Sequence, residues 1–495
     1  MRRNRLLYLT VLLITLGNVA MAQKKEQKTN FIQILTDDQG WGDLASFGHQ
    51  FIKSPNIDKL GEEGVKLTNC YAADGVCSPS RSSILTGRTP YRNGVYRWVP
   101  ASHFCYLRKS EITLPQLMRK EGFSTAHFGK WHLNGFQEER VGKTEIYKNF
   151  KWGVKGQPSM EEYGYDYWFA TPNVARPNHK DPENFFLNGE LLGKIEGYSA
   201  QIVAKQFVDW FLHKRDKSKP FFITIWFHEP HGPINSNPEF VKLYDKLKDP
   251  SMQQFLANVT QIDDAVGTIV NALKQEGVFD DTFIWYTSDN GPEGIHEYGT
   301  FNQDDHVYGN SRYRGDTGGL KGRKRWTHEG GIRVPGIISW PNGLAKYGYP
   351  EGKLSAEPVI GSDIFPTFLE VAGIDLPKGV IYDGVSAIPL LKEKKIKRER
   401  PLYWRNNTQE YRVAIRVDNW KLLCDAKRTK FVLYDLEKDI RETTDLSAYY
   451  PKVVERMKKQ LIALDNEVLT EGPDWWKGDK FLKGQLPDDK ELNTK

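Results

Sequence analysis

The sequence predicts an α/β fold, in which a mixed, mainly parallel central sheet lies between helices and a smaller C-terminal domain combines an antiparallel sheet with a helix. Short apolar runs at 31–35, 221–227 and 282–286 are typical of buried strands, and each ends in a polar cluster. Apolar residues at spacings of four and three predict amphipathic helices over 255–273 and 202–211. Such alternation indicates a sheet covered on both faces, with ligands bound beyond the carboxyl ends of its strands.

The domain organisation follows from the length of the chain and from a change in residue composition near residue 391. A chain of 495 residues is too long for one ordinary core. A charge run at 392–400 precedes short strand patterns at 401–405, 411–416 and 430–435, and a closing helix pattern covers 454–464. We therefore expect a signal peptide at 1–22, a catalytic domain at 23–391, and a small α+β domain with its tail at 392–495.

The first residues resemble an export signal. Three arginines precede an apolar run at 6–19 and Ala-Met-Ala at 20–22, which is the pattern of a signal peptide with its cleavage site. An uncleaved anchor is the alternative, but the run is shorter than the roughly 20 residues that a span requires. We expect a periplasmic or secreted protein with no stable membrane insertion after signal cleavage.

Charge and cysteine content exclude two classes of protein. Loss of the three N-terminal arginines lowers the formal net charge from +6 to +3 (6 − 3 = 3), which does not indicate nucleic acid as a partner. Four cysteines are few for an exported protein of this length, so disulfides are not expected to be its framework.

Hard oxygen ligands follow two of the predicted strands. Asp37 and Asp38 come after the first strand, and Asp289 and Asn290 follow the strand near 285. Carboxylate and amide oxygens suit Ca²⁺ or Mg²⁺, whereas zinc prefers His or Cys. Each pair alone is more often a helix cap or a turn. Their matched placement at two strand ends predicts one divalent cation site.

Cys77 precedes a predicted helix. Ser-Pro-Ser-Arg at 78–81 places Pro at the helix start, and Leu-Thr-Gly-Arg at 85–88 places Gly at its end. Free backbone N–H groups and the helix dipole favour an anion at such an N-terminus. A small buried cysteine before a helix is the structural alternative, and the spacing alone leaves both open.

These segments together resemble the type I sulfatases, whose signature Cys-x-Pro-Ser-Arg, followed by Leu-Thr-Gly-Arg, carries a cysteine that a maturation enzyme oxidises to formylglycine. The resemblance covers roughly 30 to 390 and implies an alkaline-phosphatase-like fold, sulfuric ester hydrolase activity and a formylglycine-generating partner. The other similar segments are Thr-Asp-Asp-Gln-Gly at 36–40, Gly-Lys-Trp-His at 129–132, Pro-His-Gly-Pro at 230–233, Ser-Asp-Asn-Gly at 288–291 and Glu-Gly-Gly-Ile-Arg-Val-Pro at 329–335.

The resemblance also assigns roles to individual residues. Arg81 is similar to the arginine that steadies the hydrated aldehyde, and His132 to the histidine that acts as base. One Ca²⁺ is implied, with ligands from Asp37, Asp38, Asp289, Asn290 and the modified residue 77. The groups that surround the sulfate, where cations stabilise growing oxygen charge, are Lys130, His231 and Lys324.

Two of these assignments leave alternatives open. His231 or Lys324 could protonate the leaving alcohol. Lys324 is preferred as the lysine that binds the sulfate, because its spacing from Glu329 in the sequence fits the family pattern. Lys321 is the alternative. In the implied mechanism the hydrated formylglycine attacks sulfur in line with the leaving oxygen. His132 then removes the remaining hydroxyl proton, which expels sulfate and restores the aldehyde.

The expected substrate is a sulfated saccharide, because the chain is rich in aromatic residues that stack on sugars. The neighbourhood of the motifs resembles enzymes for galactose or N-acetylgalactosamine sulfates. One alternative is a sulfatase that acts on another sulfated glycan, with glucosamine or uronic acid sulfate. The others are a phosphodiesterase or phosphonate hydrolase of the same superfamily and a non-catalytic glycan-binding relative. Candidate sugar contacts are His103, Arg108, Arg176, His296, His306 and Arg312.

Overall fold

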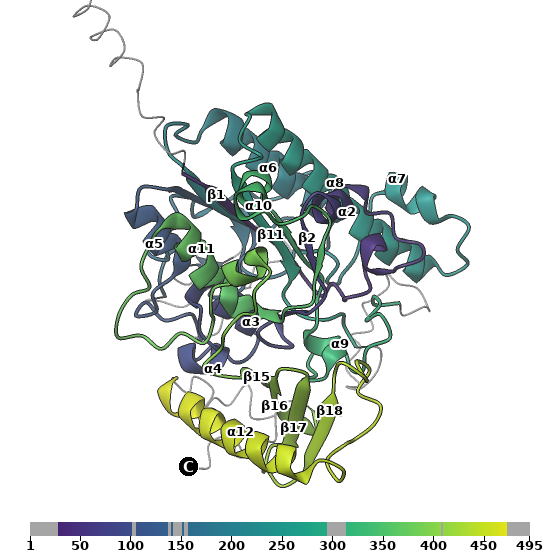
Figure 1. Cartoon of the computed structure of the whole chain (residues 1–495). Helices are drawn as coiled ribbons and strands as arrows, with labels where there is room; N and C mark the ends of the chain where they lie inside the picture. Colours follow the sequence, from purple (N-terminus) through teal and green to yellow (C-terminus); the bar gives the residue numbers. More distant parts are fainter. Residues whose placement is uncertain are drawn as a thin grey trace, which may run out of the picture.

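The computed structural model describes residues 28–100, 105–136, 140–141, 151–152, 157–294, 313–406 and 409–472. A ten-stranded sheet forms its centre, in the order β13-β2-β12-β11-β1-β10-β4-β7-β8-β9 (Figure 1). Its parallel middle consists of β11 (Thr282–Ser288), β1 (Asn30–Thr36), β10 (Phe221–Trp226), β4 (Ser124–Lys130) and β7 (Tyr167–Thr171). The flanking strands are β13 (Leu354–Ser355), β2 (Val65–Leu67), β12 (Gly336–Ser339), β8 (Phe186–Leu187) and β9 (Glu190–Leu191).

Helices cover both faces of this sheet, as the sequence predicts. In β1, Phe31 and Leu35 face one apolar layer while Ile32 and Ile34 face the other, because side chains alternate along a strand. The second layer packs on α2 (Pro55–Glu62), α6 (Ser199–His213) and α8 (Pro250–Gln275). The first packs on α3 (Cys77–Thr86), α5 (Leu114–Lys120), α10 (Pro341–Tyr347) and α11 (Ile364–Ala372).

A smaller antiparallel sheet follows the large sheet in the sequence and lies beyond α3 (Figure 1). Its strands are β15 (Leu402–Arg405), β16 (Tyr411–Val417), β17 (Trp420–Asp425) and β18 (Phe431–Asp435), and α12 (Pro451–Glu471) lies across them. Three of these strands coincide with predicted runs, while β17 was not predicted. Helix α12 is longer than the predicted 454–464.

The segment at 329–335, one of the similar motifs, joins the two sheets. Glu329 in α9 (Glu329–Ile332) accepts a bond from Lys421 of β17 at 2.8 Å and one from Arg333 at 2.7 Å. All three side chains are buried, so removing one would leave an uncompensated charge. Glu329 is therefore a structural residue of the domain junction.

The cysteines, the helix lengths and the short elements complete the description of the fold. All four cysteines are buried free thiols. Among the described helices, none is long and apolar enough to cross a membrane. The predicted signal peptide at 1–22 lies outside the described residues. The remaining short elements are β3 (Cys70–Tyr71), β5 (Arg140–Val141), β6 (Lys151–Trp152), β14 (Val359–Ile360), α4 (Pro90–Asn93) and α7 (Pro238–Val241).

Candidate active site

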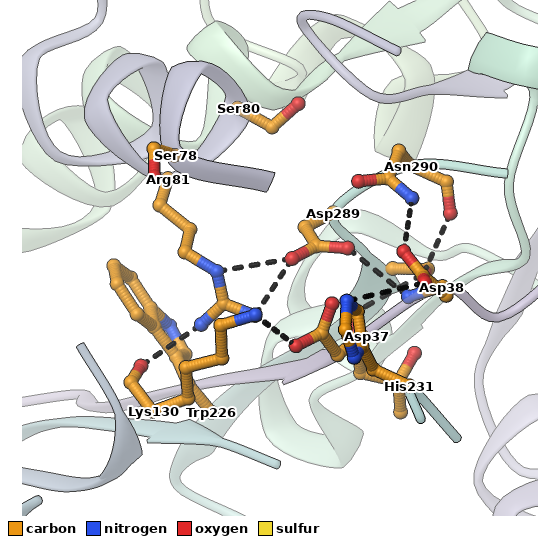
Figure 2. A network of polar contacts seen from close by, with 12 residues as sticks. Asp37, Asp38, Ser78, Ser80, Arg81, Lys130, Trp226, His231, Asp289 and Asn290 are labelled. Atoms are coloured by element: carbon orange, nitrogen blue, oxygen red, sulfur yellow. Dashed lines mark hydrogen bonds and ion pairs between the residues drawn. The ribbon is translucent and has the colours of Figure 1, made fainter. Parts of the chain in front are cut away.

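The carboxyl ends of two neighbouring strands, β1 and β11, build the floor of the site. Asp37 and Asp38 follow β1, and Asp289 follows β11, with Thr36 and Ser288 paired at the last position of the ladder. Asp289 N–H donates to the Thr36 carbonyl at 3.1 Å, which fixes the two acidic turns side by side. Asp38 has a φ of 62°, a left-handed conformation that aspartate tolerates better than most residues. The predicted strand-end cluster therefore forms (Figure 2).

Two carboxylates and the Cys77 sulfur lie close together on this floor. The possible ligand atoms of Asp37, Cys77 and Asp289 lie within 4.8 Å of one another. Asn290 Nδ2 donates to Asp38 Oδ1 at 2.7 Å, which turns the amide oxygen of Asn290 away from that carboxylate. Asp37 Oδ1 and Asn290 Oδ1 are buried without a hydrogen-bond partner among the described residues. A buried cluster of this kind fits a hard divalent cation.

Three cationic side chains surround the carboxylates. Arg81 donates to Asp289 Oδ2 through Nε at 3.0 Å and Nη2 at 2.7 Å. Lys130 Nζ lies 2.5 Å from Asp37 Oδ2. Lys324 Nζ lies 2.6 Å from Asp38 Oδ1 and 2.8 Å from Oδ2. All three cations are buried, so the site holds positive charge beside the acidic cluster.

The ionisation of the carboxylates reflects this crowding. Burial raises the pKa of Asp37, but Lys130, then His231 and Arg81, more than offset it and leave that pKa well below its usual range. Burial, followed by the charge of Asp37, raises the pKa of Asp289 to about 7. Two acids so close together resist joint ionisation, and a bound cation would relieve this repulsion.

Cys77 is the first residue of α3, after Val76 in extended conformation, and Gly87 ends the helix with a φ of 68°. The sequence prediction of a helix from Pro to Gly at this position is thus confirmed. Burial raises the pKa of the Cys77 thiol, although Lys130 and Lys324 oppose the rise. An unmodified Cys77 is therefore a protonated thiol at neutral pH and a weak nucleophile.

Two histidines face the same centre. His132, with a φ of 62°, is buried and neither ring nitrogen has a hydrogen-bond partner among the described residues. Burial, then Lys130 and Arg81, holds its pKa well below the usual value, so the ring is neutral and can accept a proton. His231 Nε2 lies 3.7 Å from Asp38 Oδ2, and burial, then Lys324, lowers the pKa of His231 to about 4.

The two candidate sulfate lysines have different surroundings. Lys324 contacts Asp38, whereas Lys321 Nζ donates to the Glu442 carbonyl at 3.2 Å and to the Tyr434 hydroxyl at 3.3 Å, both in the C-terminal domain. Burial lowers the pKa of Lys324, but Asp38 and Glu293 raise it above the ordinary value overall. Of these two lysines, Lys324 is thus the one at the acidic cluster.

Of the candidate sugar contacts, the structure describes only Arg108 and Arg176. Arg108 is half-buried and donates to Glu111 and to the Arg92 carbonyl, at 2.5 and 3.0 Å, so its guanidinium is engaged in packing α4. Arg176 is exposed on the segment after β7. The remaining candidates, His103, His296, His306 and Arg312, lie outside the described residues.

Two further side chains at the site, Glu293 and Trp226, were not assigned a role from sequence. Glu293 lies three residues after Asn290, and its carboxylate contacts both Lys324 and Arg325. Trp226 ends β10 with its ring 5.2 Å from the Arg81 guanidinium carbon. Their positions beside Ser-Asp-Asn-Gly and at a strand end were the available signals.

Comparison with known proteins agrees with the geometry. The sulfatase family profile matches residues 29–374, and a profile described as N-sulphoglucosamine sulphohydrolase, C-terminal, matches residues 321–467. A solved structure, Ps i-CgsB in complex with k-i-k-neocarrahexaose, superposes with a TM-score of 0.77 at 24% identity, covering 94% of this chain and 100% of that chain. That similarity supports the alkaline-phosphatase-like arrangement of a mainly parallel sheet with a C-terminal antiparallel sheet.

Named relatives extend the match. N-acetylgalactosamine-6-sulfatase of Rattus norvegicus is 28% identical over 414 residues, covering 78% of this chain and 70% of the relative. Steryl-sulfatase of Homo sapiens is 27% identical over 558 residues, covering 92% of this chain and 91% of the relative. Because the family profile covers well over half of the chain, this protein belongs to the sulfatase family and is a sulfuric ester hydrolase.

Proposed function

We propose that the protein removes sulfate from galactose or N-acetylgalactosamine sulfates with a formylglycine made from Cys77 and one Ca²⁺. The observation that supports this chemistry most strongly is the position of Cys77. It begins α3 within 4.8 Å of the Asp37 and Asp289 ligand atoms, with Arg81, Lys130 and Lys324 around them. The hydrated aldehyde at position 77 would supply the hydroxyl that attacks sulfur.

The surrounding residues have complementary tasks in this proposal. Asp37, Asp38, Asp289 and Asn290 would hold Ca²⁺, and a bound ion would neutralise charge and orient the sulfate. Arg81 positions residue 77 because it bridges α3 to Asp289 and to the Lys130 carbonyl. The remaining tasks are proton removal from residue 77 by neutral His132, and binding of the sulfate oxygens by Lys130, Lys324 and His231.

The saccharide class rests on the relatives. N-acetylgalactosamine-6-sulfatase supports the galactose configuration. The C-terminal match to the N-sulphoglucosamine sulphohydrolase profile supports a glucosamine sulfate as second candidate. The test is a turnover screen on defined sulfated galactose, N-acetylgalactosamine, glucosamine and uronic acid saccharides, using protein with confirmed modification at position 77. Faster cleavage of glucosamine or uronic acid sulfates than of every galactose-configured sulfate would overturn the substrate proposal.

The same screen addresses the superfamily alternatives. Phosphate diesters and phosphonate esters should be turned over far more slowly than sulfate esters. Preference for the phosphorus esters would assign the phosphodiesterase function instead. Binding of sulfated glycans without turnover of any ester would assign a glycan-binding role.

We also propose export to the periplasm or the medium, followed by maturation with a formylglycine-generating enzyme as partner. The support is the signal-peptide pattern at 1–22. Cell fractionation with N-terminal sequencing tests it, and the mature chain should begin at Gln23. Mature protein in the cytosol with residues 1–22 still attached would overturn the proposal.

A further inference from the structure

Glu293 and Arg325 form an ion pair at the edge of the acidic cluster. Arg325 donates to both carboxylate oxygens of Glu293, with Nη2 at 3.2 Å from Oε2 and Nη1 in closer contact with Oε1. Lys324 Nζ lies 3.6 Å from the same Glu293 Oε2 and 2.6 Å from Asp38 Oδ1. A continuous chain of charges therefore runs from Asp38 through Lys324 to this pair.

Glu293 and Arg325 are more exposed to solvent than Lys324. The side chain of Lys324 is only 3% exposed, whereas those of Glu293 and Arg325 are 31% and 37% exposed. Both can therefore meet a molecule whose sulfate is held by Lys324. Burial lowers the pKa of Arg325, but the charges of Glu293, Asp38 and Cys77 raise it overall, so the guanidinium is charged.

The backbone holds Arg325 in this position firmly. Its φ of 74° is left-handed, a conformation that favours Gly or Asn over arginine. Arg325 N–H donates to the Gly75 carbonyl at 2.7 Å, two residues before Cys77. A Cβ at Gly75 would lie 2.9 Å from the Trp326 carbonyl oxygen, so the turn presses against the start of the nucleophile helix.

A second set of bonds fixes the acidic member of the pair. Lys324 N–H donates to the Pro292 carbonyl at 2.9 Å, and Arg323 Nε donates to the Glu293 carbonyl at 2.7 Å. The segment at 323–325 thus lies along 292–293. Two partly exposed charged side chains are held rigidly beside the site, which is the arrangement that a recognition element needs.

We propose that Glu293 and Arg325 are specificity residues that bind two neighbouring hydroxyl groups of the sugar ring carrying the sulfate, an inference that rests on the proposed function. The carboxylate accepts a hydrogen bond from one hydroxyl, and the guanidinium donates one to the adjacent oxygen. The pair carries no net charge, and Glu293 repels a second anionic group. The recognised surface is therefore a neutral diol rather than a carboxylate or second sulfate.

The experiment compares two substrates in fully matured protein. Glu293→Gln keeps the side-chain shape, and Arg325→Asn suits the left-handed backbone. Either change should lower kcat/KM on the best saccharide sulfate by about 10- to 100-fold, the effect of one hydrogen bond to a charged group. Turnover of 4-nitrophenyl sulfate, which lacks the diol, should change by less than about twofold. Lys353→Gln, in the exposed Lys353–Glu393 pair, is the control and should leave both rates unchanged.

A change in the substrate, combined with the change at Glu293, tests whether the two groups contact each other. The analogue is a deoxy sugar that lacks a hydroxyl next to the sulfate-bearing carbon. The parent should cleave this analogue as slowly as Glu293→Gln cleaves the intact sugar. Glu293→Gln should cleave the analogue no more slowly than the parent does. Equal losses on saccharide and aryl sulfate, or no loss on either, would overturn the recognition role and leave the sulfatase assignment standing. If the matured parent hydrolysed neither ester, the proposed function would fall and this inference with it.

Discussion

Arg81 and Asp289 join the nucleophile helix to the floor of the site through two bonds to one oxygen. The guanidinium reaches Asp289 Oδ2 with Nε and Nη2, and its Nη1 donates to the Lys130 carbonyl at 2.9 Å. The Trp226 ring lies against the guanidinium (Figure 2). Helix α3, β4 and β11 are thereby held in one geometry around residue 77.

The Arg81→Lys variant tests whether the bonds that position residue 77 are needed, or whether a positive charge at position 81 is enough. Lysine keeps one positive charge but cannot bind Asp289 with two nitrogens and the Lys130 carbonyl with a third. We expect kcat to fall by about 10²- to 10³-fold while the circular dichroism spectrum stays that of the parent. Near-parent kcat in this variant would show that charge alone suffices at this position.

The cation can be tested without measuring activity. Removal of Ca²⁺ by a chelator should lower the thermal midpoint of unfolding, because the folded protein alone holds the complete oxygen cluster. Added Ca²⁺ should restore the midpoint in the parent, and Asp38→Ala should abolish this response. Restoration by Zn²⁺ alone, or a full response in Asp38→Ala, would contradict the assigned ligands.

The two lysines near residue 324 provide a matched pair. Lys324→Met removes the buried cation at Asp38 and should lower kcat/KM by about 10²- to 10³-fold. Lys321→Met removes contacts to the C-terminal domain and should leave kcat/KM within about twofold of the parent value. The reverse ranking of the two variants would assign the sulfate lysine to position 321.

The buried ring of His328 at the junction between the two domains should make the free energy of unfolding fall in acid. Its ring is buried among Trp326, Tyr411 and Tyr434, and burial, then Lys421 and Lys321, lowers the pKa of His328 to about 3. The folded state therefore binds fewer protons than the unfolded state between about pH 6.5 and 3. The stability from a neutral His328 is complete above that window and is lost as the pH falls through it.

His328→Phe should remove this contribution while filling a similar volume. Urea unfolding at pH 7.5 and pH 5 measures it. Between these two pH values the parent should lose about 2 kcal/mol more free energy of unfolding than the variant. Parallel pH profiles for the two proteins would show that the ring is protonated without cost in the folded state.

The sequence predicts those parts of the fold whose apolar pattern is strong. The runs at 31–35, 221–227 and 282–286 correspond to β1, β10 and β11, and Asp37 and Asp289, which follow β1 and β11, lie close together as expected. Strand β4 (Ser124–Lys130) was missed, although it is central, because it contains only Ala126 and Phe128 as apolar residues. Strand β17 was missed because its neighbour β16 ends only at Val417, with a two-residue turn between them.

The sequence predicts the floor of the site better than its rim, where Glu293 and Arg325 lie. The floor residues occupy strand ends and a helix start, whose positions follow from local pattern. Glu293 and Arg325 meet because segments 292–293 and 323–325, about thirty residues apart in the sequence, are hydrogen-bonded to each other, and because Arg325 itself has a left-handed backbone. No periodicity or spacing encodes such a contact, and it requires the tertiary structure.

The dependence of turnover on the state of residue 77 is the most direct test of the central proposal. Peptide mass spectrometry gives the fraction of chains with formylglycine in several preparations, and sulfate release from a saccharide substrate is measured for each. Because burial keeps the unmodified Cys77 thiol protonated, turnover should be proportional to the formylglycine fraction and extrapolate to zero. Cys77→Ser should bind substrate without multiple turnovers. Full turnover by protein with wholly unmodified Cys77 would contradict the proposed mechanism.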